Sequence, residues 1–299
     1  MNEFSILNGF NVKDPQARAN IDYIIERLGQ LYNPNLLING GFQVWQRGET
    51  KRANLTQSPF YLADRWQVYS SSQNTYITCS KNGYGMHVLV EGNETCKVRQ
   101  IFENPLPGGD YTISFNVVEL SGNVKLRYFN EGVNQPDIDI VEGINTVTIN
   151  VTSLDEISFF FYGASTLTLN WVKLEAGRIA TQYVPEHYQD VLVKCKRYYQ
   201  KTTAYEYFGP IISMGSGIFR CSSTYHGFRE NPTVKFETDT KFPIYNYTST
   251  GESVSPDVTS IDLSESGNLK VTTNNTSLPL GTTGIAQLSK VVEFDAEIY

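Results

Sequence analysis

The chain offers few residues for acid–base or nucleophilic chemistry. Its 299 residues include three histidines, His87, His187 and His226. None of them lies beside a GxSxG nucleophile turn, and none belongs to an HExxH zinc pattern. The sequence therefore contains no motif of serine-hydrolase or zinc-protease catalysis.

Paired carboxylates leave one route to catalysis open, because a glycosidase needs only two acids at a fixed separation. Several acids could supply such a pair: Glu103, Asp110, Glu119, Asp137, Asp139 and Glu142. Most of them flank turn signals, where solvation is the ordinary explanation. We therefore expect a protein that is not an enzyme, with glycan cleavage as the less favoured alternative.

The sequence predicts no metal site and no cofactor. Cys79, Cys96, Cys195 and Cys221 are scattered without CxxC spacing, so reduced, buried thiols are expected. The acidic stretch 137–139 lacks the DxDxDG pattern of a calcium loop.

The charge and hydropathy patterns limit the partners. A net charge of −7 without a Lys/Arg cluster predicts no nucleic-acid partner. No apolar run approaches the roughly 20 residues that span a bilayer, so no membrane insertion is expected. The start, MNEFSILNGF, lacks the basic and apolar regions of a secretory signal, which predicts synthesis in the cytoplasm.

Aromatic side chains are the best candidates for ligand binding. A group in the C-terminal third lies beside glycine or in turn-rich sequence: Tyr205, Tyr207, Tyr225, His226, Tyr245 and Tyr247. Tyrosine offers flat contact area and one hydroxyl at low entropic cost, which suits a polyhydroxylated ligand. The alternative is that each is an ordinary strand residue.

A second set of candidates lies near the N-terminus: Trp45, Arg47, Asp64, Arg65 and Trp66. An indole face can stack on sugar C–H groups while Asp and Arg bind hydroxyls. The favoured alternative places both tryptophans in a core, with the Asp64–Arg65 dipeptide pairing near a strand start, because both segments lie in strand-like sequence.

Short alternating runs predict antiparallel β-strands from residue 35 onward. They include 86–90, 111–117, 124–128 and 147–151, separated by turn signals at 107–110, 121–123 and 142–143. The run 158–162, SFFFY, is apolar on both faces, as in a strand covered on both sides. Trp171 is expected in the core, in phase with Leu167 and Leu169. Gly177 and Pro185 then end this strand before a short helix.

The first 32 residues predict a helix that needs partners. Asp14 followed by Pro15 is a helix start, and apolar residues then follow coiled-coil spacing: Ala17, Ile21, Ile24, Leu28 and Leu31. Two heptads are too short to be stable alone. Isoleucine along this apolar stripe favours a coiled coil of three helices. The alternative is a single helix that packs on its own β domain.

The expected fold is therefore mainly β, in four parts. A coiled-coil trimerisation or attachment helix spans 1–32, and a jelly-roll-like β-sandwich spans 33–186. A linker helix spans 187–200, and a second, C-terminal β-sandwich spans 201–299.

Several segments resemble a carbohydrate-binding-like module of tailed-bacteriophage tail fibres and receptor-binding proteins. The specific ones are 35–48, NLLINGGFQVWQRG, with 63–66, ADRW, and 171–177, WVKLEAG, with 195–199, CKRYY. Weaker ones are 228–234, FRENPTV, and 295–298, DAEI. At the start, 8–10, NGF, and 12–14, VKD, resemble tail-protein N-termini from phages of Gram-positive bacteria.

The resemblance implies a homotrimer at the virion tail tip that binds a host cell-surface polysaccharide or teichoic acid-like glycan. Its N-terminus would contact other tail or baseplate proteins. A purely structural tail component is the alternative, and a depolymerase is the less favoured one, since no long β-helix repeat is present.

Overall fold

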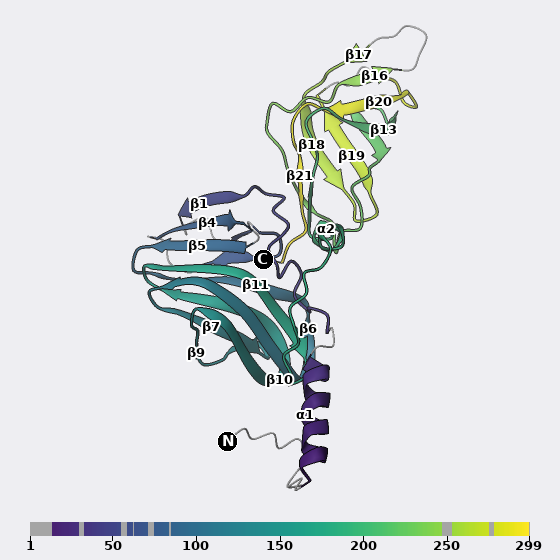
Figure 1. Ribbon diagram of the computed structural model, residues 1–299. Coiled ribbons are helices and arrows are strands. Elements are labelled where there is room, and N and C mark those ends of the chain that lie inside the picture. Colours follow the sequence, from purple (N-terminus) through teal and green to yellow (C-terminus); the bar gives the residue numbers. More distant parts are fainter. Residues whose placement is uncertain are drawn as a thin grey trace.

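The computed structural model describes residues 14–29, 33–54, 59–61, 63–70, 75–83, 85–246, 253–274 and 278–298. Strands dominate these ranges, and the sheets are arranged as β-sandwich-like layers (Figure 1). Within these ranges the helices are α1, Pro15–Gly29, and α2, Tyr188–Lys196. None of the described helices is long and apolar enough to cross a membrane.

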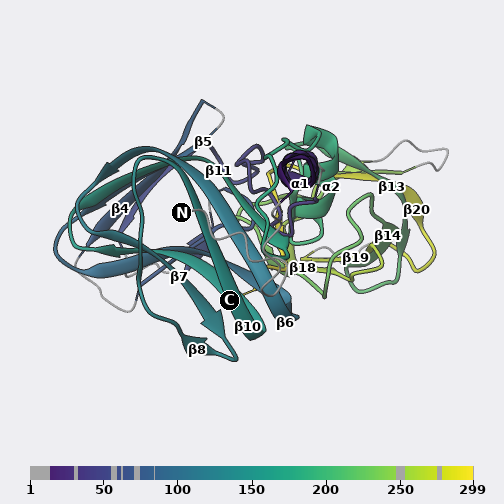
Figure 2. The same ribbon diagram turned by 60° about the horizontal axis from the view of Figure 1, so that its bottom comes forward.

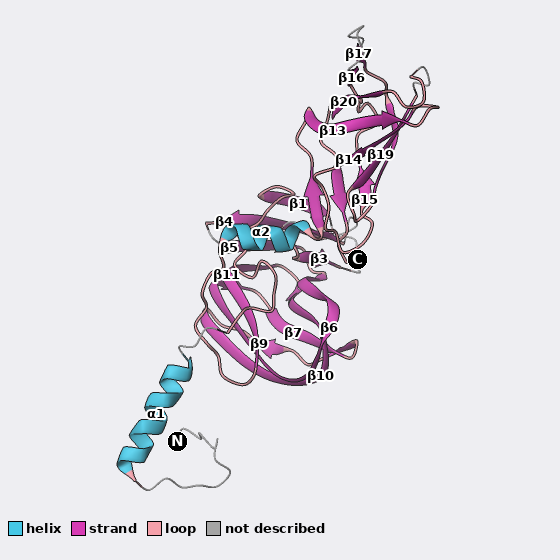
Figure 3. Ribbon diagram, turned by 90° about the vertical axis from the view of Figure 1, so that its right-hand side faces the viewer, coloured by secondary structure: helices cyan, strands magenta, loops and turns pink. Residues whose placement is uncertain are grey.

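The expected N-terminal coiled coil is wrong. α1 is a single helix of 15 residues that extends away from the β-sheets with no second helix beside it (Figure 3). Asp14 caps it, since its Oδ1 accepts from Gln16 N at 2.8 Å. Ile24 is 54% exposed and Ala17 and Ile21 are half-buried. A helix pair of only two heptads is not stable without further partners, so the apolar spacing alone does not establish a coiled coil.

The side chain of Leu28 and all of Leu31 lie outside the described residues. The alternative of a helix packed on its own β domain is not what α1 shows either, because Tyr23 and Ile24 both face solvent.

The first β domain is one antiparallel network that curls around a core. Its main strand order is β1-β4-β5-β11-β6-β10-β7-β8, with β2, β3 and β9 paired at its sides. The strands are β1 (Thr50–Asn54), β2 (Phe60–Tyr61), β3 (Gln67–Tyr69), β4 (Tyr76–Asn82), β5 (Gly85–Glu91), β6 (Thr95–Ser121), β7 (Val124–Asn130), β8 (Val133–Asn134), β9 (Ile138–Asp139), β10 (Gly143–Tyr162) and β11 (Ser165–Ala176).

The long strands β6 and β10 join the two layers of this domain. They pair along almost their whole length, with a register shift between Leu154 and Glu156. Phe115 of β6 and Phe159 of β10 meet edge-on across the core, with ring centroids 5.3 Å apart and planes at 81°. Both rings are fully buried, so the alternation of these strands positions one large core cluster.

The prediction that Trp171 lies in the core is wrong. β11 shifts register against β6 between Leu169 and Trp171, which moves the buried phase from Leu167 and Leu169 to Val172 and Leu174. Trp171 is left half-buried and stacks on Tyr183, with ring centroids 4.6 Å apart and planes at 2°. A one-residue shift turns every following side chain to the other face.

α2 packs against the first domain and leads into the second. His187 is its N-cap, and Val191 and Cys195 form a small buried cluster with Val44. The second domain then follows with β12 (Tyr199–Lys201), β13 (Glu206–Ser213), β14 (Ile218–Ser222), β15 (Thr233–Lys235), β16 (Ile244–Asn246), β17 (Ser253–Val254), β18 (Val258–Leu263), β19 (Asn268–Thr273), β20 (Thr283–Leu288) and β21 (Glu293–Asp295).

The second domain contains a large and a small antiparallel sheet. The large one has the order β17-β16-β20-β13-β14-β19-β18, and the small one has the order β12-β21-β15. Phe219, Phe242 and Phe294 are among the fully buried residues of their shared core. β21 is the last strand, and the residues after it reach back to the first domain (Figure 1).

Candidate ligand-binding surfaces

Both N-terminal tryptophans lie inside the first domain. Trp66 is 1% exposed and its Nε1 donates to Asn39 O at 3.0 Å. Its ring lies against Phe42, with centroids 5.1 Å apart. Trp45 is buried as well, and its Nε1 donates to Phe42 O at 2.6 Å. Because both indole N–H groups are already bonded inside the core, these rings offer no surface for a sugar.

The charged members of the same set hold the two domains together. Arg65 is 2% exposed, and its Nη1 lies 2.5 Å from Glu297 Oε2 at the C-terminus. Arg47 Nη1 lies 3.4 Å from Glu297 Oε1 and 3.6 Å from Asp64 Oδ1. Its Nη2 lies 3.5 Å from Asp295 Oδ1. We call these charged residues the junction cluster: Arg47, Asp64, Arg65, Asp295 and Glu297. They hold the first domain against the end of the second.

Aromatic rings complete the junction cluster. The guanidinium of Arg47 lies 3.6 Å from the ring centroid of Tyr199, and that of Arg65 lies 3.8 Å from Tyr198. Arg65, which is buried, and Arg47, whose side chain is only 12% exposed, face three buried carboxylates. A further cation, Lys235, reaches Asp295 from the solvent side at 3.3 Å, and its side chain is 57% exposed.

Asp64 makes the stability of the fold depend on pH. Burial raises the pKa of Asp64 from 3.8 to about 6, and attraction to Arg47 lowers it only in part. The folded chain therefore takes up a proton near pH 6 that the unfolded chain takes up near pH 4. This stabilisation is fully present below about pH 4 and is lost as the pH rises through 6, a difference of about 3 kcal/mol.

Urea unfolding of the wild type and of Asp64→Asn between pH 4 and 7.5 measures this difference. Because asparagine does not titrate, the variant is expected to gain stability relative to the wild type as the pH rises. If the difference in the free energy of unfolding between wild type and Asp64→Asn stayed constant with pH, the raised pKa of Asp64 would be contradicted.

Two of the six C-terminal candidates lie side by side on the surface. Tyr207 of β13 and Tyr245 of β16 flank β20, with ring centroids 6.4 Å apart. The Tyr245 hydroxyl lies 3.3 Å from Gln287 Oε1. Tyr205, Tyr207 and Tyr245 are all exposed. This small patch is consistent with a weak contact to a ligand.

The structure separates the other C-terminal candidates from this pair. Tyr225 is half-buried, its hydroxyl is bonded to Glu206 Oε2, and its ring lies 5.3 Å from that of Phe294. His226 is exposed, and its carbonyl accepts from Gln200 Nε2 at 2.9 Å. Tyr247 lies outside the described residues.

Sequence reasoning missed a surface on the first domain. Figure 2 shows β6, β10 and β7 side by side, and β3 pairs with β6 at the edge of this group. Their outer side carries alternating aromatic and charged residues. One row across the strands pairs Tyr69 with Lys97, Lys97 with Phe160, and Phe160 with Lys125. We define the aromatic–ionic face by Tyr69, Lys97, Arg99, Lys125, Arg127, Phe129, Asp137, Glu156, Phe160 and Tyr162.

Cation–π contacts hold the rings of this face. Lys97 Nζ lies 4.5 Å from the centroid of Phe129 and 5.3 Å from that of Phe160. The Arg127 guanidinium lies 4.5 Å from Phe160, and that of Arg99 lies 4.5 Å from Tyr69. Each ring is thereby fixed in place before any ligand arrives.

Ion pairs hold the charges of the face. Glu156 binds Lys97 Nζ at 2.6 Å and Arg99 Nη1 at 2.7 Å. Asp137 binds Arg127 Nε and also the Tyr162 hydroxyl, the latter at 3.0 Å from Oδ2. Hydrogen bonding to Arg127 lowers the pKa of Asp137, so this carboxylate is ionised at neutral pH.

The run 158–162 contains the sequence pattern that indicates this face, because aromatic residues occupy both sides of the strand. The sequence predicts a strand covered on both sides, but of its aromatic residues only Phe159 and Phe161 lie in the core. Phe160 and Tyr162 are half-buried on the outer side, where their rings stack 6.4 Å apart. The partners of Phe160 on neighbouring strands are Lys97, which is buried, and Lys125, whose side chain is 26% exposed, so the face is only partly open to solvent.

Within the described ranges, no group of three or more His, Cys, Asp or Glu side chains could hold a metal ion. All four cysteines are buried and free, and burial raises the pKa of their thiols.

The comparison with protein-family models found no match, and neither did the comparison with curated proteins. Among solved structures, this chain is similar to carbohydrate-binding modules. TmCBM61 in complex with beta-1,4-galactotriose is 16% identical at a TM-score of 0.30, and the match covers 48% of this chain and 99% of that chain. A mutant of a family 29 carbohydrate-binding module is 14% identical at a TM-score of 0.29, covering 45% and 97%.

Proposed function

We propose that this chain binds a glycan without cleaving it, and that it does so on a bacteriophage or phage-like tail that contacts a host surface. The aromatic–ionic face carries the proposal. It combines half-exposed rings with carboxylates and cations on one rigid sheet, and these are the groups that contact sugar C–H bonds and hydroxyls.

Preorganisation explains how such a face would bind. Sugar hydroxyls offer donors and acceptors around the ring, while their C–H groups need a flat apolar partner. Tyr69, Phe160 and Tyr162 supply the flat partners, and Asp137 supplies an acceptor, while buried Glu156 holds Lys97 and Arg99 in place. Because ion pairs and cation–π contacts already fix these side chains, little conformational entropy is lost on binding.

The tail assignment rests on the sequence resemblance of segments 35–66 and 171–199. The homotrimer stays a prediction, which light scattering of the full chain checks. Three weak sites on one particle would raise avidity by about 10² to 10⁴. The exposed Tyr207–Tyr245 pair is proposed as a secondary contact on the same ligand.

A decoration experiment tests the proposed function. Fluorescently labelled full-length chain is applied to a panel of Gram-positive cells and to an array of neutral and acidic glycans. Binding to intact cells that disappears after chemical removal of surface polysaccharide is expected, with no release of reducing sugar. A chain that decorates no cell and binds no arrayed glycan is instead a structural tail component, and released sugar would make it a depolymerase.

A further inference from the structure

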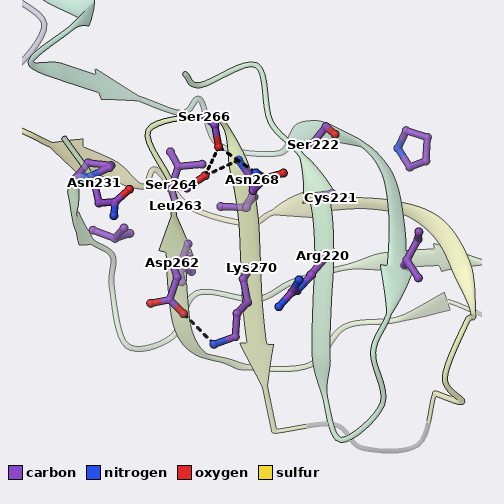
Figure 4. A pocket seen from close by; sticks show the side chains of 16 residues that line it. Arg220, Cys221, Ser222, Asn231, Asp262, Leu263, Ser264, Ser266, Asn268 and Lys270 are labelled. Carbon is purple, nitrogen blue, oxygen red and sulfur yellow. Dashed lines mark hydrogen bonds and ion pairs between the residues drawn. The ribbon is translucent and has the colours of Figure 1, made fainter. Parts of the chain in front are cut away.

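The second domain contains a groove of about 860 Å³ on the outer side of its large sheet (Figure 4). Strands β13, β14, β19 and β18 form its floor, and segment 231–234 forms one wall. Pro210 and Ile212 line the β13 side, and Pro232 and Val234 line the opposite side. The groove thus has apolar sides and a polar floor.

One row of directly opposed residues crosses this floor. Ile212 lies opposite Arg220, Arg220 lies opposite Lys270, and Lys270 lies opposite Asp262. Lys270 Nζ pairs with Asp262 Oδ2 at 3.2 Å. Figure 4 shows Arg220 beside Lys270 on the neighbouring strand. The side chain of Arg220 forms no hydrogen bond or ion pair with any residue that the structure describes.

This arrangement has an excess of positive charge. The charged lining residues are Arg220, Lys270 and Asp262, so the groove holds two cations and one carboxylate, which pairs with Lys270 alone. Like charges directly opposite each other on neighbouring strands destabilise a sheet. In a chain of net charge −7, an unpaired guanidinium on a hollowed surface is a local site of opposite sign to the whole protein.

We propose that this groove binds an anionic substituent of a glycan chain, a phosphate or a carboxylate, with the oxyanion between Arg220 and Lys270. The proposal deepens the proposed function by naming the ligand class of a second site. The guanidinium donates to two oxygens of the anion at once. Asn268 at the start of β19, and Ser264 and Ser266 in the turn before it, line one end of the groove and are bonded to one another. Their remaining hydroxyl and amide capacity can reach the attached polyol.

The apolar sides fit the same class of ligand. A polyol phosphate or a uronate chain presents C–H groups along its backbone, and these can lie against Ile212 and Val234. A free inorganic anion would use only the two cations, whereas a polymer would also fill the length of the groove. Affinity is therefore expected to rise from inorganic phosphate to an oligomer.

Calorimetric titration of the full chain tests the proposal with three probes: glycerol-phosphate oligomers, oligogalacturonate and inorganic phosphate. At least one oligomer is expected to bind more tightly than phosphate, and Arg220→Gln is expected to weaken it about tenfold or more. Arg220→Lys retains the charge but loses the forked pair of donors, so it is expected to weaken binding less than Arg220→Gln does. Binding of the glycerol-phosphate oligomer alone identifies phosphate as the anion, and binding of oligogalacturonate alone identifies carboxylate.

The matched control is Lys201→Gln, because Lys201 is exposed in the same domain but lies outside the groove. It removes the same charge and is expected to change affinity by less than twofold. Equal losses in Arg220→Gln and Lys201→Gln, or no oligomer binding at all, would overturn the proposal. Thermal melting is expected to show no loss of stability in Arg220→Gln, since that variant removes a like-charge opposition.

The two proposals fail in different ways. If Arg220→Gln loses the anionic oligomer but the wild type decorates no cell, the groove is right and the host-surface function is wrong. If the wild type decorates cells and Arg220→Gln binds the oligomer as the wild type does, the groove assignment is wrong and the function stands.

Discussion

Replacing Arg65 by glutamine is expected to reduce the free energy of unfolding by about 3 to 5 kcal/mol, the usual cost of breaking a buried ion pair. The substitution leaves one arginine, Arg47, facing Asp64, Asp295 and Glu297. It also removes the donor to Ile101 O, which Arg65 Nη2 reaches at 2.7 Å. Urea unfolding at pH 7.5 measures the loss.

Two comparisons isolate the cause of that loss. Glu297→Gln leaves two arginines facing two carboxylates, so it is expected to cost less than Arg65→Gln although it touches the same bond. Arg52→Gln breaks an exposed pair with Glu91, whose charged atoms lie 2.9 Å apart, and is expected to cost at most about 1 kcal/mol. If Glu297→Gln cost more than Arg65→Gln, the charge balance would not be what sets the stability of the junction.

The alternation of single strands was predictable from the sequence. Ile113, Phe115 and Val117 point into the core, as their spacing indicates. The helix start at Asp14-Pro15 was also predictable, since a cap and its N–H partners lie within three residues. These features depend on neighbours in sequence, and local chemistry suffices for them.

The resembling segments turn out to be structural where the structure describes them. Asn35 Nδ2 donates to Val172 O at 2.8 Å, and its Oδ1 accepts from Leu174 N at 2.9 Å. A Cβ on Gly40 would lie 2.3 Å from Val172 O, so the glycine lets the loop approach β11. Asn35 and Gly40 therefore serve the packing of this loop against β11.

Partners far apart in sequence were beyond sequence reasoning. Arg65 and Glu297 are 232 positions apart, and no local pattern links them. The register shift in β11 was also hidden, because Trp171 continues the alternation of Leu167 and Leu169 in sequence. The aromatic–ionic face depends on which strands become neighbours, so its rows of rings and charges exist only after the sheet has formed.

Replacing Tyr69 by alanine is expected to weaken binding of the best neutral glycan on the array by at least about tenfold, or ~1.4 kcal/mol. Tyr69 is 37% exposed and lies at the end of the row that continues through Lys97 and Phe160. Its removal takes away one flat surface and leaves Arg99 without the ring beneath it. Calorimetric titration at fixed salt measures the change.

Tyr76→Ala is the matched control for this prediction. Tyr76 is 42% exposed in the same domain, and the guanidinium of Arg52 lies 4.3 Å from its ring centroid. The variant Tyr76→Ala therefore removes the same kind of side chain and the same kind of cation–π contact as Tyr69→Ala. Tyr76 lies on β4, however, outside the aromatic–ionic face. An unchanged affinity in Tyr76→Ala combined with a loss in Tyr69→Ala would assign the loss to the face. If both variants bound the glycan as the wild type does, the contact surface would lie elsewhere, and the Tyr207–Tyr245 pair would be the next to test.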